Sequence, residues 1–253
     1  MNDISLSRLH ESASAVFTAH RGASFEDAEN TLAAFDRAVN LGADIIEFDL
    51  YISKDGVPVV LHDGTIDRTS DGHGHAEEMT LAELRQYNFS YFVRGGRLEK
   101  PLHPDLTIPT FEDVLRGFRD RACMNIQVYA KPDGLREICR LYLEYDMRDR
   151  GYLTIARRET ADLVRAYSPE IEICLTPGWH ERALPENLEM CAKYGCRFVQ
   201  PTAESVTAET FELCRRLGLR DNIFFADTQE EADRLKALGA RGIMTNRIGA
   251  LHG

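Results

Sequence analysis

The sequence predicts an α/β protein folded as a (β/α)8 TIM barrel, with a β-hairpin and a small insertion after the second strand. Three observations predict this fold. Short β-rich runs alternate with amphipathic helical patterns after residue 121, two more strand patterns precede them, and 253 residues suit one barrel. We therefore expect a single domain over residues 1–253, with a doubly wound open sheet as the alternative fold.

The first two barrel strands are expected at residues 15–20 and 44–50, which read AVFTAH and DIIEFDL. Between them, apolar side chains including Leu32, Phe35 and Val39 recur at the spacing of one helical face. Gly42 then suits the C-terminal cap of that helix. Together these segments predict the first strand–helix–strand unit of the barrel.

A further apolar run, VPVVLHD at residues 57–63, follows too closely for a helix to intervene, so it predicts a hairpin with the second strand. With a turn near Asp55, residues whose numbers add to about 110 lie opposite one another. His62 then returns beside Glu47 and Asp49. We expect the stretch from about 64 to 109, with its GHGH tract, to be an insertion that covers part of the barrel mouth.

The remaining six strands are expected in the second half of the chain, each but the last followed by a helical stretch. They lie at residues 124–130, 151–156, 171–176, 197–201, 222–226 and 242–246. In a (β/α)8 barrel the chemistry lies at the C-terminal ends of the strands. Polar residues at those ends are therefore the candidates for function.

The net negative charge of the chain restricts the classes of molecule that it can bind. Because 41 acidic residues outnumber 30 basic ones and give a formal charge of −11, we expect a small-molecule partner rather than nucleic acid. An anionic substrate then needs a local positive centre. The chain shows no basic leader, no long apolar run and no C-x-x-C pair among six cysteines. These features predict a cytoplasmic protein with reduced thiols and no stable membrane insertion, and they leave the oligomeric state open.

The end of the first strand carries a histidine and an arginine, His20 and Arg21, where the barrel opens into its functional face. A histidine there can also cap a turn or be satisfied in the core. On the second strand, Glu47 and Asp49 are two residues apart and point to the barrel interior. The pair requires a cation, either a divalent metal or an ion pair with Arg21 or Arg68, and chelation favours the metal.

The third strand places Asn125, Gln127 and Tyr129 on one face, beside the carboxylates of the second strand. The amide oxygen of Gln127 can bind a metal, although a neutral ligand attracts a divalent ion less than a carboxylate does. A hydrogen-bonded polar layer in the core is the alternative explanation of this pattern.

Seven motifs then occur in order along the chain. They are AHRGAS, ENTLAAF, GADIIEFDL, KDGVPVVLHD, RTSDGHG, MTLAELRQ and IPTFEDVL, and LGARGIMTNR follows near the C-terminus. With these motifs the chain resembles the glycerophosphodiester phosphodiesterase family, whose members are (β/α)8 barrels that hydrolyse glycerophosphodiesters to glycerol 3-phosphate and an alcohol. The resemblance implies one divalent cation, Mg²⁺ or Ca²⁺, as cofactor.

The resemblance also assigns roles. It implies that His20 and His62 are the catalytic acid and base, and that Glu47 and Asp49 bind the metal. It further implies that Arg21 contacts the phosphate and that Glu29 belongs to the pocket. In the family mechanism a neighbouring hydroxyl of the substrate attacks phosphorus, one histidine acting as base and the other protonating the leaving alcohol, before the cyclic phosphate is hydrolysed.

The chain departs from the family on the third strand. An N-x-E-x-K pattern is usual there, whereas this chain has Gln127 for the glutamate and Tyr129 for the lysine. Gln127 is then the third metal ligand, and Lys131 reaches the phosphate if the strand continues that far. Two alternatives to a metal-dependent phosphodiesterase follow: a catalytically impaired barrel that binds a phosphorylated small molecule, and a metal-free sugar-phosphate lyase that uses Lys131.

Overall fold

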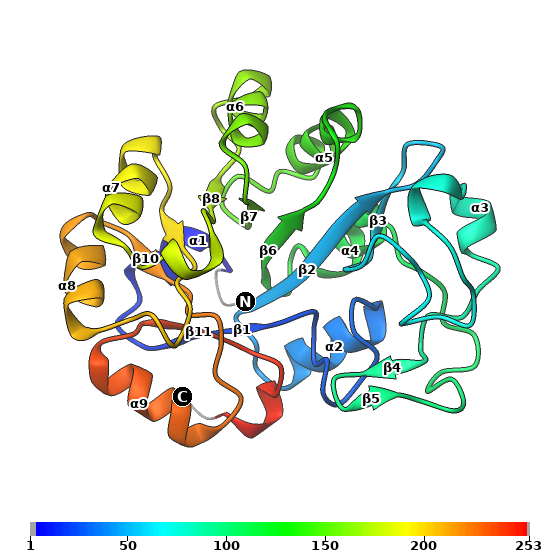
Figure 1. Cartoon of the computed structure of the whole chain (residues 1–253), viewed down its shortest axis with the longest axis horizontal. Helices are drawn as coiled ribbons and strands as arrows, with labels where there is room; N and C mark the ends of the chain where they lie inside the picture. The colour runs from blue at the N-terminus through cyan, green and yellow to red at the C-terminus, as the bar shows by residue number, and fades with distance from the viewer. Residues whose placement is uncertain (1–3, 252–253) are drawn as a thin grey trace.

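The computed structural model describes residues 4–251, so both outer limits of the expected domain lie outside the described residues. Its parallel strands curl into a ring with helices outside (Figure 1). Six of them are hydrogen-bonded in the order β11 (Gly242–Thr245), β1 (Val16–Ala19), β2 (Ile45–Ile52), β6 (Cys123–Val128), β7 (Gly151–Ile155) and β8 (Ile173–Leu175).

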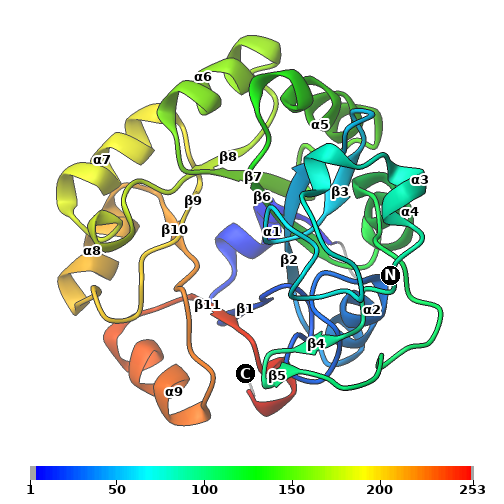
Figure 2. The same cartoon turned by 45° about the vertical axis from the view of Figure 1, so that its right-hand side comes forward.

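Two short parallel strands, β9 (Phe198–Val199) and β10 (Arg220–Asp221), complete the ring between β8 and β11 (Figure 2). After β10, Ile223 pairs with Ile243 of β11 through isolated bridges rather than a continuous ladder. This arrangement is the predicted (β/α)8 TIM barrel. The strand expected at residues 222–226 is displaced, because its regular pairing with β9 is already made at Arg220–Asp221.

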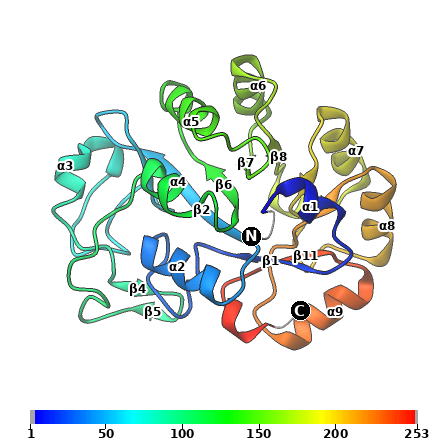
Figure 3. The same ribbon diagram turned by 180° about the vertical axis from the view of Figure 1, so that it is seen from behind.

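The outer helices follow the strands in the expected alternation (Figure 3). They are α2 (Leu32–Asn40), α4 (Phe111–Phe118), α5 (Pro132–Glu144), α6 (Arg158–Tyr167), α7 (Pro185–Tyr194), α8 (Ala208–Arg216) and α9 (Gln229–Leu238). Threonine side chains cap several of them, Thr31 accepting from Ala34 N–H and Thr228 from Glu231 N–H. Within residues 4–251 no helix combines the length and apolar character needed to cross a bilayer.

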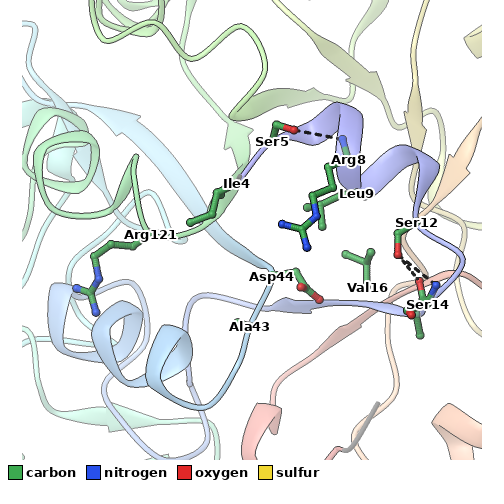
Figure 4. Close-up of a pocket in the computed structure, with 11 residues that line it drawn as sticks. Ile4, Ser5, Arg8, Leu9, Ser12, Ser14, Val16, Ala43, Asp44 and Arg121 are labelled. Atoms are coloured by element: carbon green, nitrogen blue, oxygen red, sulfur yellow. Dashed lines mark hydrogen bonds between the residues drawn. The ribbon is translucent and has the colours of Figure 1, made fainter. Parts of the chain in front are cut away.

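The N-terminal end of the barrel is covered by α1 (Leu6–Glu11), which crosses it in the view from behind (Figure 3). Leu6 is fully buried in a cluster with inward residues of the strands, including Val16, Tyr152 and Phe198. A pocket of about 420 Å³ lies between this helix and the barrel. Figure 4 shows residues that line it, among them Arg8 and Asp44. The opposite, C-terminal end therefore remains as the mouth of the barrel.

The hairpin partner of β2 is β3 (Pro58–Val60), in a register that sets Leu50 opposite Val60. Those numbers add to 110, the value that a turn near Asp55 requires. Between β3 and α4 the chain forms short elements with a small apolar cluster of their own. They are the 3-10 helix η1 (Ala76–Glu78), α3 (Leu81–Leu84), β4 (Phe92–Val93) and β5 (Gly96–Arg97), and later 3-10 turns are η2 (Trp179–Glu181) and η3 (Ile248–Ala250).

Candidate active site

The loop after β1 turns Arg21 back over the carboxylates at the mouth. Arg21 has a left-handed backbone, with φ of 57°, and its N–H donates to Glu47 Oε2 at 2.9 Å. Its Nη1 donates to Glu29 Oε1 at 2.9 Å, and its Nε lies 3.4 Å from Asp49 Oδ2. One residue thereby contacts three carboxylates through its backbone and its side chain. The strained backbone is compensated by these contacts.

The glycine after Arg21 is required by packing. Gly22 has φ of 79°, and a Cβ on it would lie 2.8 Å from the backbone carbonyl carbon of Ala34 in α2. A side chain at this position would push the loop away from the helix. The sequence His-Arg-Gly therefore sets the histidine and the arginine at the mouth by anchoring the loop on α2.

The two carboxylates of β2 are buried and incompletely neutralised. Glu47 is 4% exposed and Asp49 is 1% exposed. Burial raises the pKa of Glu47 well above its usual value, and the charge of Asp49 raises it further. Burial also raises the pKa of Asp49, against the opposing effects of Arg21 and a 2.9 Å hydrogen bond from Asn30 Nδ2. The arginine alone therefore leaves this pair short of positive charge.

His20 is held in one tautomer by a chain of hydrogen bonds from the loops after β10 and β11. Asn246 Nδ2 donates to Asp227 Oδ2 at 2.8 Å, which directs the Asn246 amide oxygen at His20 Nδ1, 2.7 Å away. Because that oxygen can only accept, Nδ1 carries the proton and Nε2 is free, 3.9 Å from Glu47 Oε2. Burial, followed by the charge of Arg21, lowers the pKa of His20 to about 3.

A second arginine joins the segment between β3 and α4 to this cluster. Arg68 Nη2 donates to Glu29 Oε1 at 2.7 Å, and its Nε donates to Asp63 Oδ2 at 2.6 Å. Burial acts to raise the pKa of Glu29, but hydrogen bonds and charge from Arg68 and Arg21 outweigh it and lower that pKa. Glu29 is therefore an ionised bridge between two guanidinium groups.

His62 lies on the hairpin side of the mouth. Its Nδ1 is 2.6 Å from Asp63 Oδ1, its side chain is 32% exposed, and the Leu61 N–H donates to the Asp49 carbonyl. The ring makes an edge contact with Tyr129, which in turn stacks on Tyr51. His62 is thus beside Asp49, as the hairpin register predicts, and it is far more accessible than His20.

The third strand aligns its polar residues with the carboxylates of β2. Asn125 pairs in register with Glu47, and Gln127 pairs with Asp49. Gln127 Nε2 donates to the Thr154 carbonyl at 3.3 Å, and its amide oxygen accepts no hydrogen bond from residues 4–251. That placement is compatible with Gln127 as a metal ligand. It is also compatible with a polar layer in the core, because the neighbouring Asn125 accepts a hydrogen bond from Thr154 Oγ1.

The expectation that Lys131 reaches this cluster is wrong. β6 ends at Val128, and Lys131 is the residue that precedes α5, so the two-residue alternation of a strand no longer sets its direction. The Lys131 side chain is 78% exposed, and its Nζ contacts Glu77 Oε2 at 2.7 Å. It therefore forms a surface ion pair at the rim.

The donor set fits a hard divalent cation. Across residues 4–251 no group of three or more His, Cys, Asp or Glu side chains has metal-site geometry, and the expected set contains only two such residues with an amide. Arg21 engages Asp49 as in the ion-pair alternative, yet burial still keeps the pKa of both carboxyl groups raised, and a bound cation would offset that effect. Oxygen donors of this kind suit Mg²⁺ or Ca²⁺.

Comparison with known proteins identifies the family. The model of the glycerophosphoryl diester phosphodiesterase family matches residues 20–250. The chain belongs to this family of phosphoric diester hydrolases. A glycerophosphodiester phosphodiesterase of Caldanaerobacter subterraneus subsp. tengcongensis is 29% identical over 237 residues, which cover 90% of this chain and 92% of that protein.

Two solved structures share the fold. The glycerophosphodiester phosphodiesterase of Agrobacterium tumefaciens superposes with a TM-score of 0.77 at 22% identity, covering 93% of this chain and 99% of that one. An Oleispira antarctica phosphodiesterase in complex with the product sn-glycerol-3-phosphate gives 0.78 at 21% identity, with coverage of 92% and 94%. The barrel described above is thus the fold of solved phosphodiesterases.

Within this member of the family, several site residues carried no usable signal in the sequence. The pairing of Asp227 with Asn246, and of Asn246 with His20, joins residues up to 226 positions apart. Strand periodicity gives the direction of a side chain but not the distance between loops. The sequence signals that do indicate the site are the His-Arg pair, the hairpin register of His62 and the two-residue spacing of polar residues on β2 and β6.

Proposed function

We propose that this chain hydrolyses a glycerophosphodiester to glycerol 3-phosphate and an alcohol with the help of one divalent cation. A single domain spanning the chain, with residues 64–109 as an insertion, carries out the reaction. The observation that supports it most is the arrangement at the mouth, where two histidines of different accessibility flank a buried pair of carboxylates. Family membership and the named activity of the relatives point to the same chemistry.

Glu47, Asp49 and Gln127 hold the cation, which when bound offsets phosphoryl charge. Arg21 binds a phosphoryl oxygen, and its own orientation is maintained by Glu29, at 2.9 Å. Because Glu29 also accepts from Arg68, the insertion helps to fix the pocket. These residues position the phosphodiester for the two histidines.

His20 acts as the base and His62 as the acid. The free Nε2 of His20 takes the proton from the substrate hydroxyl that neighbours the phosphodiester, as that oxygen forms its bond to phosphorus. The bond from phosphorus to the alcohol oxygen breaks, and His62 gives its Nε2 proton to that oxygen. Asp63, 2.6 Å from His62 Nδ1, stabilises the imidazolium charge before the transfer. Water then opens the cyclic phosphate, with the proton transfers reversed.

The proposal favours an active enzyme over the impaired barrel, because the residues needed for both proton transfers and two carboxylates are retained at the mouth. The test is an assay of glycerol 3-phosphate released from a panel of glycerophosphodiesters and lysophospholipids, with Mg²⁺, with Ca²⁺ and with chelator. Metal-dependent release by the wild-type protein supports the proposal. Saturable binding of the panel without release under any metal condition would establish the impaired barrel.

A further inference from the structure

The loop after β8 carries an arginine without an acidic partner. Arg182 follows η2, and its guanidinium carbon lies 4.8 Å from the ring centre of Trp179. Its Nε donates to the Pro177 carbonyl at 3.3 Å. Neither terminal nitrogen has an acceptor within residues 4–251, and neither is enclosed. Two donors of this guanidinium are therefore free to bind an anion from solution.

A row of aromatic rings connects this arginine with the active site. The Trp179 ring contacts Phe224 edge-on, with 4.9 Å between ring centres, and Phe224 contacts the His20 ring at 5.1 Å. Arg182 is thus connected to the His20 ring through Trp179 and Phe224.

The other arginines of the cluster are already neutralised. Arg21 is paired with Glu29 and Asp49, and Arg68 is paired with Glu29 and Asp63. Glu47 adds a further negative charge, so four carboxylates face two guanidinium groups. Even with a divalent cation the cluster has no positive charge left over for an anionic phosphodiester. An additional cation that lacks a carboxylate partner is needed.

Arg182 and Arg94 both meet that condition next to the aromatic residues that pack against His20. Arg94, at the tip of the β4–β5 hairpin, lies over Phe225 at 5.8 Å. Arg182 is the better candidate because its Nε is fixed on the Pro177 carbonyl and its guanidinium lies 4.8 Å from the Trp179 ring centre, which presents both terminal nitrogens together. Burial also lowers the pKa of Arg182, so its charge is partly stripped of water. A partly desolvated guanidinium attracts an anion more strongly than a hydrated one does.

We propose that Arg182 is a substrate-binding residue, whose two terminal nitrogens bind phosphoryl oxygens while Trp179 supports the guanidinium plane. The inference rests on the proposed function and names a specificity residue for the same site. It assigns the phosphate-binding charge at this side of the mouth to the β8 loop, in place of the exposed Lys131. The ligand is a phosphomonoester or phosphodiester of a small polyol.

The test compares Arg182→Met and Arg182→Lys with a matched control, Arg158→Met. The control removes one positive charge and one arginine–aromatic contact, over Tyr194 on the outer helices, together with an exposed ion pair to Asp162. Calorimetry with sn-glycerol 3-phosphate as probe, and kcat and KM for the best substrate of the panel, are the measurements. We expect Arg182→Met to raise the Kd of the probe and the KM by about 10- to 100-fold, with a smaller change in kcat.

Arg182→Lys should fall between the wild type and Arg182→Met, because lysine retains the charge but not the forked geometry. The control should stay within about twofold of the wild type. The inference would be overturned if folded Arg182→Met bound the probe as tightly as the wild type does. If Arg182→Met does not fold, the same conclusion would follow from Arg182→Lys binding the probe with wild-type affinity. Failure of the proposed function is distinct: wild-type protein would bind the probe through Arg182 but hydrolyse no member of the panel.

Discussion

Replacing His20 by asparagine should remove a source of acid sensitivity from the folded protein. His20 is buried against Phe224, and its pKa is lowered from 6.5 to about 3. In the unfolded chain the same ring takes up a proton near pH 6.5. A group with a depressed folded pKa contributes stability above the unfolded value, and that contribution is lost as the pH falls from 6.5 towards 3.

The magnitude follows from the gap between the two pKa values. At pH 4.5 the histidine of the unfolded chain is charged, while His20 in the folded protein is still neutral. Two pH units below 6.5 correspond to about 2 to 3 kcal/mol of lost stability. At pH 7.5 the ring is neutral in both states, so none of this stability has been lost. Glu47 and Asp49, with raised pKa values, act in the opposite direction in both proteins and largely cancel in the difference.

The assay is urea unfolding of wild type and His20→Asn at pH 7.5 and pH 4.5, in chelator so that metal binding does not contribute. Between pH 7.5 and pH 4.5 the free energy of unfolding should fall by about 2 to 3 kcal/mol more in the wild type than in the variant. His73→Asn is the control, because the His73 side chain is 81% exposed, and it should lose stability like the wild type. Equal losses in wild type and His20→Asn would refute the buried, neutral state of His20.

Three further changes test other parts of the site. Gln127→Glu should tighten Mg²⁺ or Ca²⁺ binding, on the order of tenfold in titrations. In metal-free protein the same change should lower the melting temperature, because it adds a third carboxylate. Unchanged metal affinity would show that Gln127 does not face the metal. Gly22→Ala should lower the free energy of unfolding in urea by about 2 to 5 kcal/mol, because a Cβ meets the backbone of Ala34. Gly56 is the control, because it also has a left-handed φ but has open space around it, so Gly56→Ala should lower that free energy by only about 1 to 2 kcal/mol. His62→Ala should lower kcat by about 10² to 10⁴ fold while folding normally, and an unchanged rate would exclude it as the acid.

The barrel was predictable because its signals are local and repeated. Each βα unit carries its own apolar period, and the KDG turn fixes the hairpin register, with Leu50 opposite Val60. The pattern was least informative around β10, where regular pairing falls on Arg220 and Asp221. Arg220 is buried because its guanidinium donates to backbone carbonyls, among them those of Ser12 and Ser14. No hydrophobic pattern indicates such a residue.

The site was predictable only where its residues follow strand geometry. Glu47 and Asp49 share a face because they are two residues apart on β2, and both are buried at the mouth. Lys131 was misplaced because the same rule was extended past the end of β6. Arg182 and Asn246 reach the site from loops, where contacts depend on how distant segments pack. Sequence spacing carries no such information.

The central claim is most directly tested by the release of sn-glycerol 3-phosphate from a glycerophosphodiester, measured with purified protein that has been stripped of metal and then titrated with Mg²⁺ or Ca²⁺. We predict no release in chelator, saturable restoration by at least one of the two ions, and loss of the restored activity in His20→Ala. Release at the same rate in chelator, or at the same rate in His20→Ala, would contradict the account.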